Sequence, residues 1–297
     1  MIIDCHAHLD VRSLEIEDMV KKMDEEGIGR VALMARVNEE VEPKKPQFLL
    51  MVQRNMMNSS LLRPVAAAVS LAFYDEKDTL RPVWRPFTKG SVGYVKTMKM
   101  DNESVAEAIE KKPDRFWGWI FLNPKDNPGV LDEMERWRGV RGMIGVKAHP
   151  YWHRYPLADL EGIARRAEEI ALPLILHMGF GAQGDYRWLV ESFPRLKIIY
   201  AHAGIPYFKA LWPVVRGFPN AYMDLSSAHL SERFVRRAVA FAGPEKCLYG
   251  TDSPYGFLTS DGSYDYGRVK GWIDRLPVSE RDRDLILGEN FLNMINV

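Results

Sequence analysis

Histidines and one aspartate close four apolar stretches of this chain that have the character of β-strands. The first stretch contains His6 and His8, two later ones end in His177 and His202, and the fourth ends in Asp252. Strands of a parallel α/β barrel all finish at one rim, where side chains from distant parts of the chain can reach a common ion. Imidazoles and carboxylates suit Zn²⁺, Mn²⁺ and Fe²⁺. The pattern therefore predicts a metal site at the carboxyl ends of these strands.

The spacing of His6 and His8 indicates that one strand supplies two imidazoles. Residues two apart on a strand point to the same face. A histidine pair alone is weak evidence, because a strand histidine is more often a core residue with its hydrogen bonds satisfied. The recurrence of ligand residues at the ends of three later apolar stretches, each followed by turn residues, makes the metal site the better interpretation.

The order of the predicted elements favours one α/β domain over residues 1–297. Strand-like stretches alternate with amphipathic stretches, as in successive β-α units. We expect a distorted (β/α)8 TIM barrel with an insertion after an early strand. The strands are expected at residues 2–8, 30–35, 116–122, 142–148, 173–177, 197–202, 221–225 and 247–252. Helices are expected at residues 13–26, 130–137, 157–171, 186–193, 231–242, 266–273 and 279–295.

Residues 36–102 are too long for an ordinary connection between a strand and a helix. They contain apolar runs at 48–57 and 65–73. We expect an inserted subdomain, which would form a lid if it leaves the outgoing end of the second strand. Peripheral packing or a subunit interface is an equally open interpretation, because methionine-rich stripes usually pack. In another arrangement residues 64–70 form the third strand, which leaves the ligand argument unchanged.

The amino-acid composition limits the kinds of molecule that the protein is expected to bind. The 40 basic and 40 acidic residues cancel, which gives no electrostatic basis for binding nucleic acid or an anionic membrane. A small-molecule substrate is the better expectation. The apolar runs are short, and a cytoplasmic protein is predicted. The two cysteines, Cys5 and Cys247, both fall in predicted core strands and are expected to be free thiols. The composition leaves open whether the protein forms a homo-oligomer.

The ligand motifs together resemble the amidohydrolase superfamily. More closely, the chain is similar to the branch of metal-dependent hydrolases that also contains aminocarboxymuconate-semialdehyde decarboxylase. The matching residues are His6-x-His8, Lys147 in Gly-Val-Lys-Ala-His-Pro, His177, His202 in Ala-His-Ala-Gly, and Gly250-Thr251-Asp252-x-Pro254. The match runs from the first residues to residues 288–290 and leaves the insertion unmatched. These motifs are specific for fold and metal dependence and poor guides to substrate.

The resemblance implies one divalent ion, bound by His6, His8, His177 and Asp252. Zinc is the expected metal, with manganese or iron as alternatives. His202 would then stand beside the ion without necessarily binding it. Asp252 would be the general base of a metal-activated water, and His202 would polarise the substrate oxygen or donate a proton.

Lys147 leaves a second arrangement open. In two-metal members of the superfamily a lysine of the fourth strand is carbamylated and bridges two ions, and His177 and His202 both bind the second one. Lys147 stands at a compatible place, so a two-metal site is not excluded. The branch that this chain most resembles uses one ion, and an unmodified Lys147 would then bind a substrate carboxylate as a point charge.

Three further residues are expected at the functional rim. Arg36 ends the second predicted strand, Asn123 follows the third, and His149 lies two residues after Lys147 on the same strand face. Each is a candidate substrate contact. His149 has an equally good structural interpretation, because it precedes a proline that restricts its backbone.

Two reactions are the main candidates for a protein with this fold. Hydrolysis of an amide, lactone or ester carbonyl ranks first, because it is the broader expectation for the superfamily and no clear arginine pair is present for a dicarboxylate. The alternative is non-oxidative decarboxylation of an aromatic or muconate-like acid. A third possibility is a non-catalytic metal-binding scaffold, which is disfavoured because all five ligand-type residues are retained together.

Overall fold

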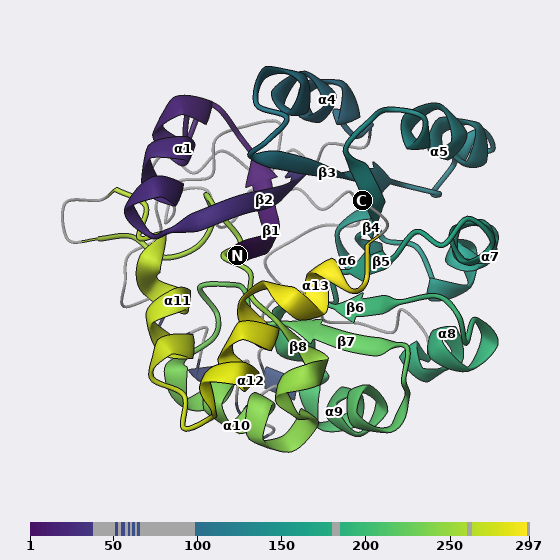
Figure 1. The fold of residues 1–297 in the computed structure, drawn as a ribbon. Coiled ribbons are helices and arrows are strands. Elements are labelled where there is room, and N and C mark those ends of the chain that lie inside the picture. Colours follow the sequence, from purple (N-terminus) through teal and green to yellow (C-terminus); the bar gives the residue numbers. More distant parts are fainter. Residues whose placement is uncertain are drawn as a thin grey trace, which may run out of the picture.

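The computed structural model describes residues 1–37, 99–179, 185–259 and 263–295, with a few short pieces between residues 51 and 65. Eight parallel strands form one sheet in sequential order, as the predicted barrel requires (Figure 1). The strands are β1 (Ile2–Leu9), β2 (Ile28–Ala35), β3 (Phe116–Leu122), β4 (Met143–Ala148), β5 (Leu174–Leu176), β6 (Ile198–Tyr200), β7 (Ala221–Asp224) and β8 (Cys247–Leu248).

Backbone hydrogen bonds bring the first strand beside the chain that continues from the last one. The amide of Cys5 donates to the carbonyl of Tyr249 at 3.0 Å, and the amide of Asp252 donates to the carbonyl of His6 at 2.8 Å. These bonds nearly close the ring. The predicted (β/α)8 class is therefore confirmed, and the predicted strands match the observed ones closely.

Most of the helices lie on the outside of the ring of strands (Figure 1). The helices are α1 (Ile16–Glu25), α4 (Asn102–Lys111), α5 (Val130–Arg138), α6 (Pro150–His153), α7 (Glu161–Glu169), α8 (Tyr186–Ser192), α9 (Phe208–Gly217), α10 (Glu232–Ala242), α11 (Gly267–Asp274), α12 (Glu280–Asp284) and α13 (Asn290–Leu292). Helix α10 illustrates how they form. The hydroxyl of Ser231 accepts from the amide of Phe234, and the apolar stripe from Phe234 to Ala242 is buried.

Two of the longer helices were not anticipated, namely α4 and α9. Helix α4 begins at Asn102, where the predicted insertion ends. Helix α9 contains Pro213, a residue that usually ends a helix. Apolar burial outweighs this local preference, because Leu211, Trp212 and Val215 of α9 all face the core.

The closing helical segment expected at residues 279–295 is present in three pieces. Between α12 and α13 lies a π-helical turn, Leu285–Glu289. The carbonyl of Ile286 accepts a hydrogen bond from the amide of Tyr249 at 2.9 Å. Gly288 lies so close to the start of β1 that an added Cβ would be 2.3 Å from the carbonyl oxygen of Met1. The π-helical turn therefore packs the C-terminal part of the chain against the first and last strands of the barrel.

Most of residues 36–102 lie outside the described residues. The expected subdomain or lid over this stretch stays a prediction. The third strand of the ring is the one expected at residues 116–122. The alternative third strand at residues 64–70 falls mostly outside the described residues.

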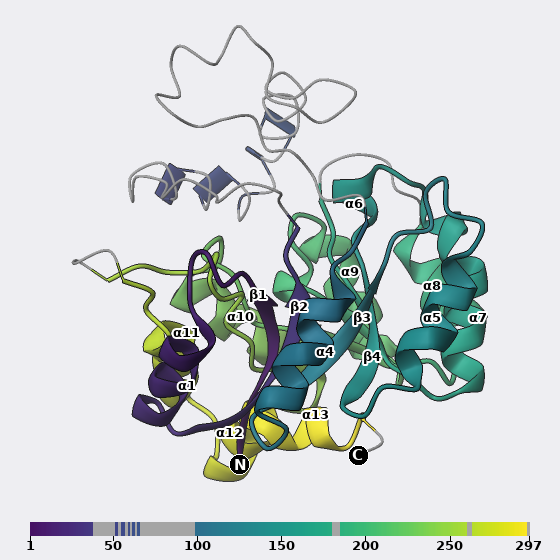
Figure 2. The ribbon, with the colours of Figure 1, turned by 90° about the horizontal axis from the view of Figure 1, so that it is seen from above.

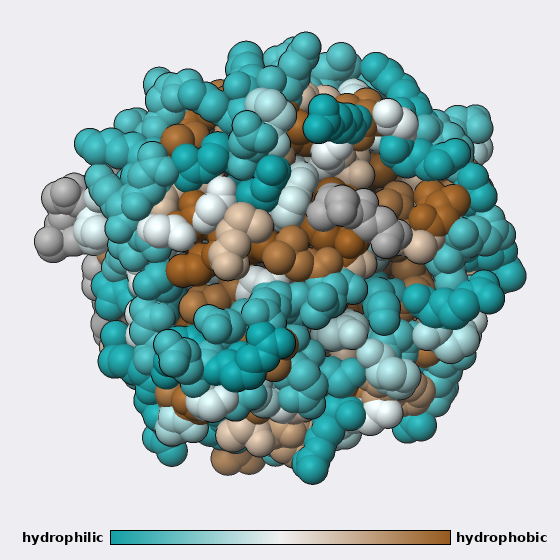
Figure 3. Space-filling model, in the orientation of Figure 1, coloured by the Kyte–Doolittle hydropathy of each residue, from teal (hydrophilic) through white to brown (hydrophobic). Residues whose placement is uncertain are grey.

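The two faces of the barrel differ. The arrowheads of β1 and β2 point away from the face that carries both ends of the chain (Figure 2). On that terminal face, hydrophobic residues gather in a band across the middle, with hydrophilic residues around it (Figure 3). Within the described ranges, none of the helices combines the length and the apolar character needed to cross a membrane.

Candidate metal centre

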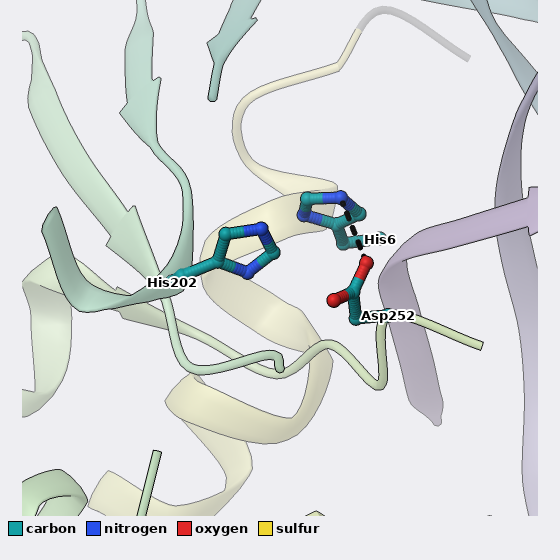
Figure 4. Close-up of side chains that lie close together, drawn as sticks. All are labelled: His6, His202 and Asp252. Carbon is teal, nitrogen blue, oxygen red and sulfur yellow. Dashed lines mark ion pairs between the residues drawn. The ribbon is translucent and has the colours of Figure 1, made fainter. Parts of the chain in front are cut away.

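Three side chains from distant parts of the sequence converge at the outgoing ends of the strands. Figure 4 shows His6 from β1, His202 from the turn after β6, and Asp252 from the segment after β8. One ligand atom of each lies within 4.8 Å of the other two. The Nε2 atom of His6 is 3.7 Å from Oδ1 of Asp252. Two ligands about 2.1 Å from one ion lie roughly 3 to 4 Å apart, so this separation fits a shared ion.

His8 reaches the same carboxylate oxygen. Its Nε2 atom also lies 3.7 Å from Oδ1 of Asp252. Its Nδ1 atom lies 2.9 Å from the carbonyl oxygen of Ala35, which can only accept, so Nδ1 carries the proton. The lone pair of Nε2 therefore faces Asp252. The two imidazoles of β1 approach one carboxylate oxygen, as their spacing predicted.

A bulge in β1 shapes this approach. Asp4 lies opposite Val31 of β2, whereas Ala7 lies opposite Leu33, so β1 has one residue more than its partner in this interval. Such bulges bend a strand and re-aim its side chains. The amide of His6 donates to Oδ1 of Asp4 at 3.0 Å, which satisfies a backbone group within the bulge.

Burial keeps the imidazoles of this region in the form that binds metals. Desolvation lowers the pKa of His8 to about 3. It also lowers the pKa of His6, His177 and His202 well below the ordinary value for an imidazole. Neutral imidazoles carry the lone pair that a metal ion requires. The donor set of neutral nitrogens and a carboxylate therefore fits a divalent transition metal.

His202 and Asp252 both adopt backbone conformations that are unusual for residues with a side chain. Their φ angles are 57° and 61°. Left-handed conformations cost free energy and collect at functional sites. His202 lies two residues past the end of β6 and Asp252 four residues past the end of β8, so both side chains lie at the rim of the barrel.

His177 lies against His202 in the structure. The Nδ1 atom of His177 is 3.0 Å from Nε2 of His202, and the two rings meet edge to face. His149 stacks on the other side of His177, with ring centroids 3.9 Å apart. The most compact group of ligand atoms therefore contains His202, whereas His177 stands next to it. The expected four-ligand set of His6, His8, His177 and Asp252 stays a prediction.

Lys147 of β4 lies directly beside this centre. Its side chain is fully buried, and Nζ is 3.4 Å from Nε2 of His6. Burial lowers the pKa of Lys147, while the nearby carboxylates of Asp224 and Asp252 act in the opposite direction. The position is compatible with a carbamylated lysine and with a cationic contact to a substrate.

A comparison with known protein families identifies the family of the chain. Residues 78–290 match the family model described as Amidohydrolase. The chain belongs to the amidohydrolase family. The resemblance inferred from the ligand motifs is therefore confirmed, and the barrel with its convergent histidines is the expected framework of an amidohydrolase.

Relatives of this amidohydrolase include decarboxylases and a hydratase. It is 21% identical over 257 residues to gamma-resorcylate decarboxylase from Polaromonas sp. strain JS666, covering 68% of this chain and 76% of the relative. It is similar in fold to a dihydroxybenzoic acid decarboxylase from Polaromonas sp. JS666 that was solved with manganese and the inhibitor 2-nitroresorcinol, with a TM-score of 0.57, 15% identity and coverage of 99% and 96%. The 4-oxalomesaconate hydratase of Rhodopseudomonas palustris gives a TM-score of 0.62 at 17% identity, with coverage of 99% and 95%.

The three expected substrate contacts of the amidohydrolase have different surroundings. Nη1 of Arg36 lies 3.5 Å from Oδ2 of Asp101. The side chain of Asn123 accepts from the amide of Lys125 at 3.1 Å and so supports a turn. His149 accepts from the amide of Trp152 at the start of α6 and stacks on His177. The structure therefore brings His149 to the histidine cluster, whereas these contacts of Arg36 and Asn123 are with other residues.

Arg36 also lines a cavity of about 560 Å³ on the flank of the amidohydrolase barrel. None of the described residues that line this cavity belongs to the cluster of His6, His202 and Asp252. The other lining residues are Lys99, Met100, Asp101, Glu103, Asp132, Glu133, Arg136 and Trp137. Opposite charges are mixed along this wall, and the ligand-type side chains lie elsewhere, at the carboxyl ends of the strands.

The sequence interpretation missed two residues that contact the histidines. Asp224 ends β7, and its Oδ2 atom lies 2.9 Å from Nδ1 of His6. Ser226 follows two residues later, with Oγ 2.8 Å from Nδ1 of His202. Asp224 carries the same signal as Asp252, a carboxylate at the end of an apolar strand. That signal was visible in the sequence and could have identified it.

Proposed function

We propose that this protein is a metal-dependent non-oxidative decarboxylase of an aromatic acid. The supporting observation is the placement of two proton-transfer groups, His202 and Asp252, in one buried cluster with His6. Hydrolysis ranked first on the sequence alone. The names of the relatives favour the alternative, because gamma-resorcylate decarboxylase matches along most of its length and a dihydroxybenzoic acid decarboxylase shares the fold.

We propose that His6, His8, His177 and Asp252 hold one divalent ion. The close approach of both β1 imidazoles to Asp252 supports three of these ligands. His202 in place of His177 is the competing choice, since His202 belongs to the most compact group of ligand atoms. The donor types accept zinc or manganese, and the related decarboxylase structure contains manganese. A bound divalent ion would hold and polarise the oxygens of the acid.

The reaction requires a proton to reach the ring carbon that carries the carboxylate. Asp252 or His202 donates this proton, and a new carbon–hydrogen bond forms. The bond to the carboxylate carbon then breaks, its electron pair returns to the ring, and carbon dioxide leaves. The donor is left without its proton and recovers one from solvent. No oxidant, reductant or water molecule is consumed.

Lys147 is the proposed partner of the substrate carboxylate. Its amine lies beside His6 at the centre of the cluster and is shielded from solvent. An ammonium group at this place attracts the negative charge of the acid and orients it toward the proton donors. The carboxylate leaves as neutral carbon dioxide, so this attraction disappears with the reaction and favours product release.

The test is an assay of carbon dioxide release from a panel of mono- and dihydroxybenzoic acids. The purified protein is loaded in turn with manganese and with zinc. We expect turnover of at least one hydroxybenzoate. Asp252→Asn and His202→Asn separate the two candidate donors, because the true donor should lose about a hundredfold or more of kcat.

Three outcomes would contradict the proposal. Cleavage of lactones or amides by a protein that releases no carbon dioxide would restore the hydrolase interpretation. Addition of water to an unsaturated acid would instead align the protein with its hydratase relative. A protein that binds the metal and is inactive in all of these assays would be a scaffold.

A further inference from the structure

Asp224 contacts both His6 and His202 through a single carboxylate. Its side chain is fully buried at the end of β7. Oδ2 lies 2.9 Å from Nδ1 of His6, and Oδ1 accepts from the backbone amide of His202 at 3.0 Å. The two histidines stack with ring centroids 4.8 Å apart. Asp224 therefore lies behind both rings, on the side away from Asp252.

The contact with His6 fixes the tautomer of that ring. A carboxylate only accepts hydrogen bonds, so Nδ1 of His6 must carry the proton. In the neutral ring the lone pair is then on Nε2, which is the atom that lies 3.7 Å from Oδ1 of Asp252. This is the tautomer that a metal ligand needs. Partners of this kind orient metal-binding histidines and raise their basicity.

Ser226 fixes the tautomer of His202 in a similar way. The hydroxyl of Ser226 donates its only proton to Oδ1 of Asp224 at 2.5 Å, and its amide donates to the same atom at 3.0 Å. The oxygen Oγ can therefore only accept from Nδ1 of His202, which is 2.8 Å away. The carbonyl oxygen of Ser226, at 3.3 Å, is a second acceptor for the same nitrogen. Nδ1 of His202 thus carries a proton, and Nε2 faces the cluster.

We propose that Asp224 and Ser226 are positioning residues that set the ring tautomers of His6 and His202, so that both rings direct Nε2 into the reaction centre. Asp224 acts on His6 directly and on His202 through Ser226. The two histidines serve different roles in the proposed function: His6 is a metal ligand, and His202 presents an unprotonated Nε2 that can bind the ion or take up the proton that it then passes to the substrate. A single buried carboxylate therefore positions both rings. The assignment of these roles rests on the proposed decarboxylase function.

The two positioning residues give separable tests. Asp224→Asn replaces an acceptor by an amide that can donate, so it disturbs both rings. Ser226→Ala removes the close hydroxyl contact with Nδ1 of His202 and a longer contact of 3.3 Å with Nδ1 of His6, and it keeps the bond between Asp224 and His6. Asp10→Asn is the matched control, because Asp10 is a buried carboxylate at the end of β1 whose partners are Arg12 and Tyr255.

The first measurement is the tautomer of each ring by nitrogen-15 nuclear magnetic resonance of histidine-labelled, metal-free protein. In the wild-type protein we expect protonated Nδ1 on both His6 and His202. Asp224→Asn should change the signals of both rings, Ser226→Ala should change those of His202 more than those of His6, and Asp10→Asn should change neither. Circular dichroism verifies that each variant is folded.

The second measurement is the affinity of the metal-free protein for manganese and for zinc, titrated against a chelator. Asp224→Asn should weaken binding by about 10- to 100-fold, the usual effect of losing a partner of a ligand histidine. Ser226→Ala should stay within about threefold of the wild type if His6 is the ligand that Asp224 supports. Neither measurement uses a substrate, so both decide the inference even if the protein is no decarboxylase. An Asp224→Asn variant with unchanged ring tautomers and wild-type affinity would overturn it.

Discussion

His6 and Asp252 contact each other in two ways, through their side chains and through their backbones. Nε2 of His6 lies 3.7 Å from Oδ1 of Asp252, and the amide of Asp252 donates to the carbonyl of His6 at 2.8 Å. His6 lies on the first strand, and Asp252 follows the last. The contact that closes the barrel is therefore also part of the candidate metal centre.

Metal binding should consequently stabilise the whole barrel. An ion that binds only the folded protein stabilises it by about 2.7 kcal/mol when its concentration is a hundred times Kd. We expect the Tm to rise when manganese or zinc is added to metal-free protein. His6→Ala should abolish most of this rise. Differential scanning calorimetry at several metal concentrations measures both effects.

The surface variant Glu232→Gln is the control for this prediction, because Glu232 pairs with Arg275 on the outside of the barrel. It should keep the full response to metal. A His6→Ala protein with a wild-type response would mean that the ion binds elsewhere.

Stability of the metal-free protein should fall as the pH drops below about 6.5. Burial lowers the pKa of His8 to about 3, whereas an imidazole in the unfolded chain titrates near its ordinary value. Between these values the unfolded chain binds a proton that the folded protein does not. The unfolded state therefore gains relative to the folded one as the pH falls, by up to about 1.4 kcal/mol per pH unit for one such group.

Urea unfolding of metal-free protein from about pH 7.5 down to about pH 4.5 measures this slope. His6, His177 and His202 shift in the same direction and should add to it. The variant His8→Asn should show a shallower slope over the same range. An identical slope in that variant would indicate that His8 is accessible to protons in the folded state.

The number of ions per chain should be close to one. Elemental analysis of protein saturated with metal and then freed of excess decides this. About two ions per chain, dependent on bicarbonate and lost in Lys147→Met, would instead indicate a carbamylated lysine that bridges two metals. In the one-ion case Lys147→Met should keep the metal and raise KM for an acidic substrate, because it removes the positive charge beside His6.

The sequence predicted the framework of this site because strand ends are visible in a parallel barrel. Apolar runs that end in His6, His8, His177, His202 and Asp252 marked both the strands and the rim where they finish. The period of two along a strand was enough to place His6 and His8 on one face. Elements defined by such short-range patterns could be predicted well.

Relationships that depend on side-chain geometry could not be predicted in this way. The pairing of His177 with His202 arises where two neighbouring strands end side by side, and no spacing in the sequence encodes it. The position of Asp224 at the end of a strand was visible in the sequence, but only packing shows that its carboxylate is buried against His6 and His202. The π-helical turn Leu285–Glu289 contacts β1 and Tyr249, and both contacts join residues that are far apart in the sequence.

The packing beneath Lys147 gives a last prediction, which concerns stability. Gly145 of β4 lies against the indole of Trp119, and an added Cβ would be 2.4 Å from the nearest ring atom and 2.8 Å from the carbonyl oxygen of Pro173. Neither the buried ring nor the backbone carbonyl can move away easily. Gly145→Ala should therefore destabilise the fold by about 1–3 kcal/mol, as overpacked cores do, although alanine normally favours regular structure over glycine.

Gly217→Ala is the matched control, because Gly217 ends α9 and an added Cβ would meet no atom within 4 Å. It should leave stability unchanged or raise it by up to about 1 kcal/mol, since it restricts the unfolded chain. Urea unfolding of the two variants measures the contrast. Equal stability would show that Trp119 can shift within the barrel to make room for the added methyl group.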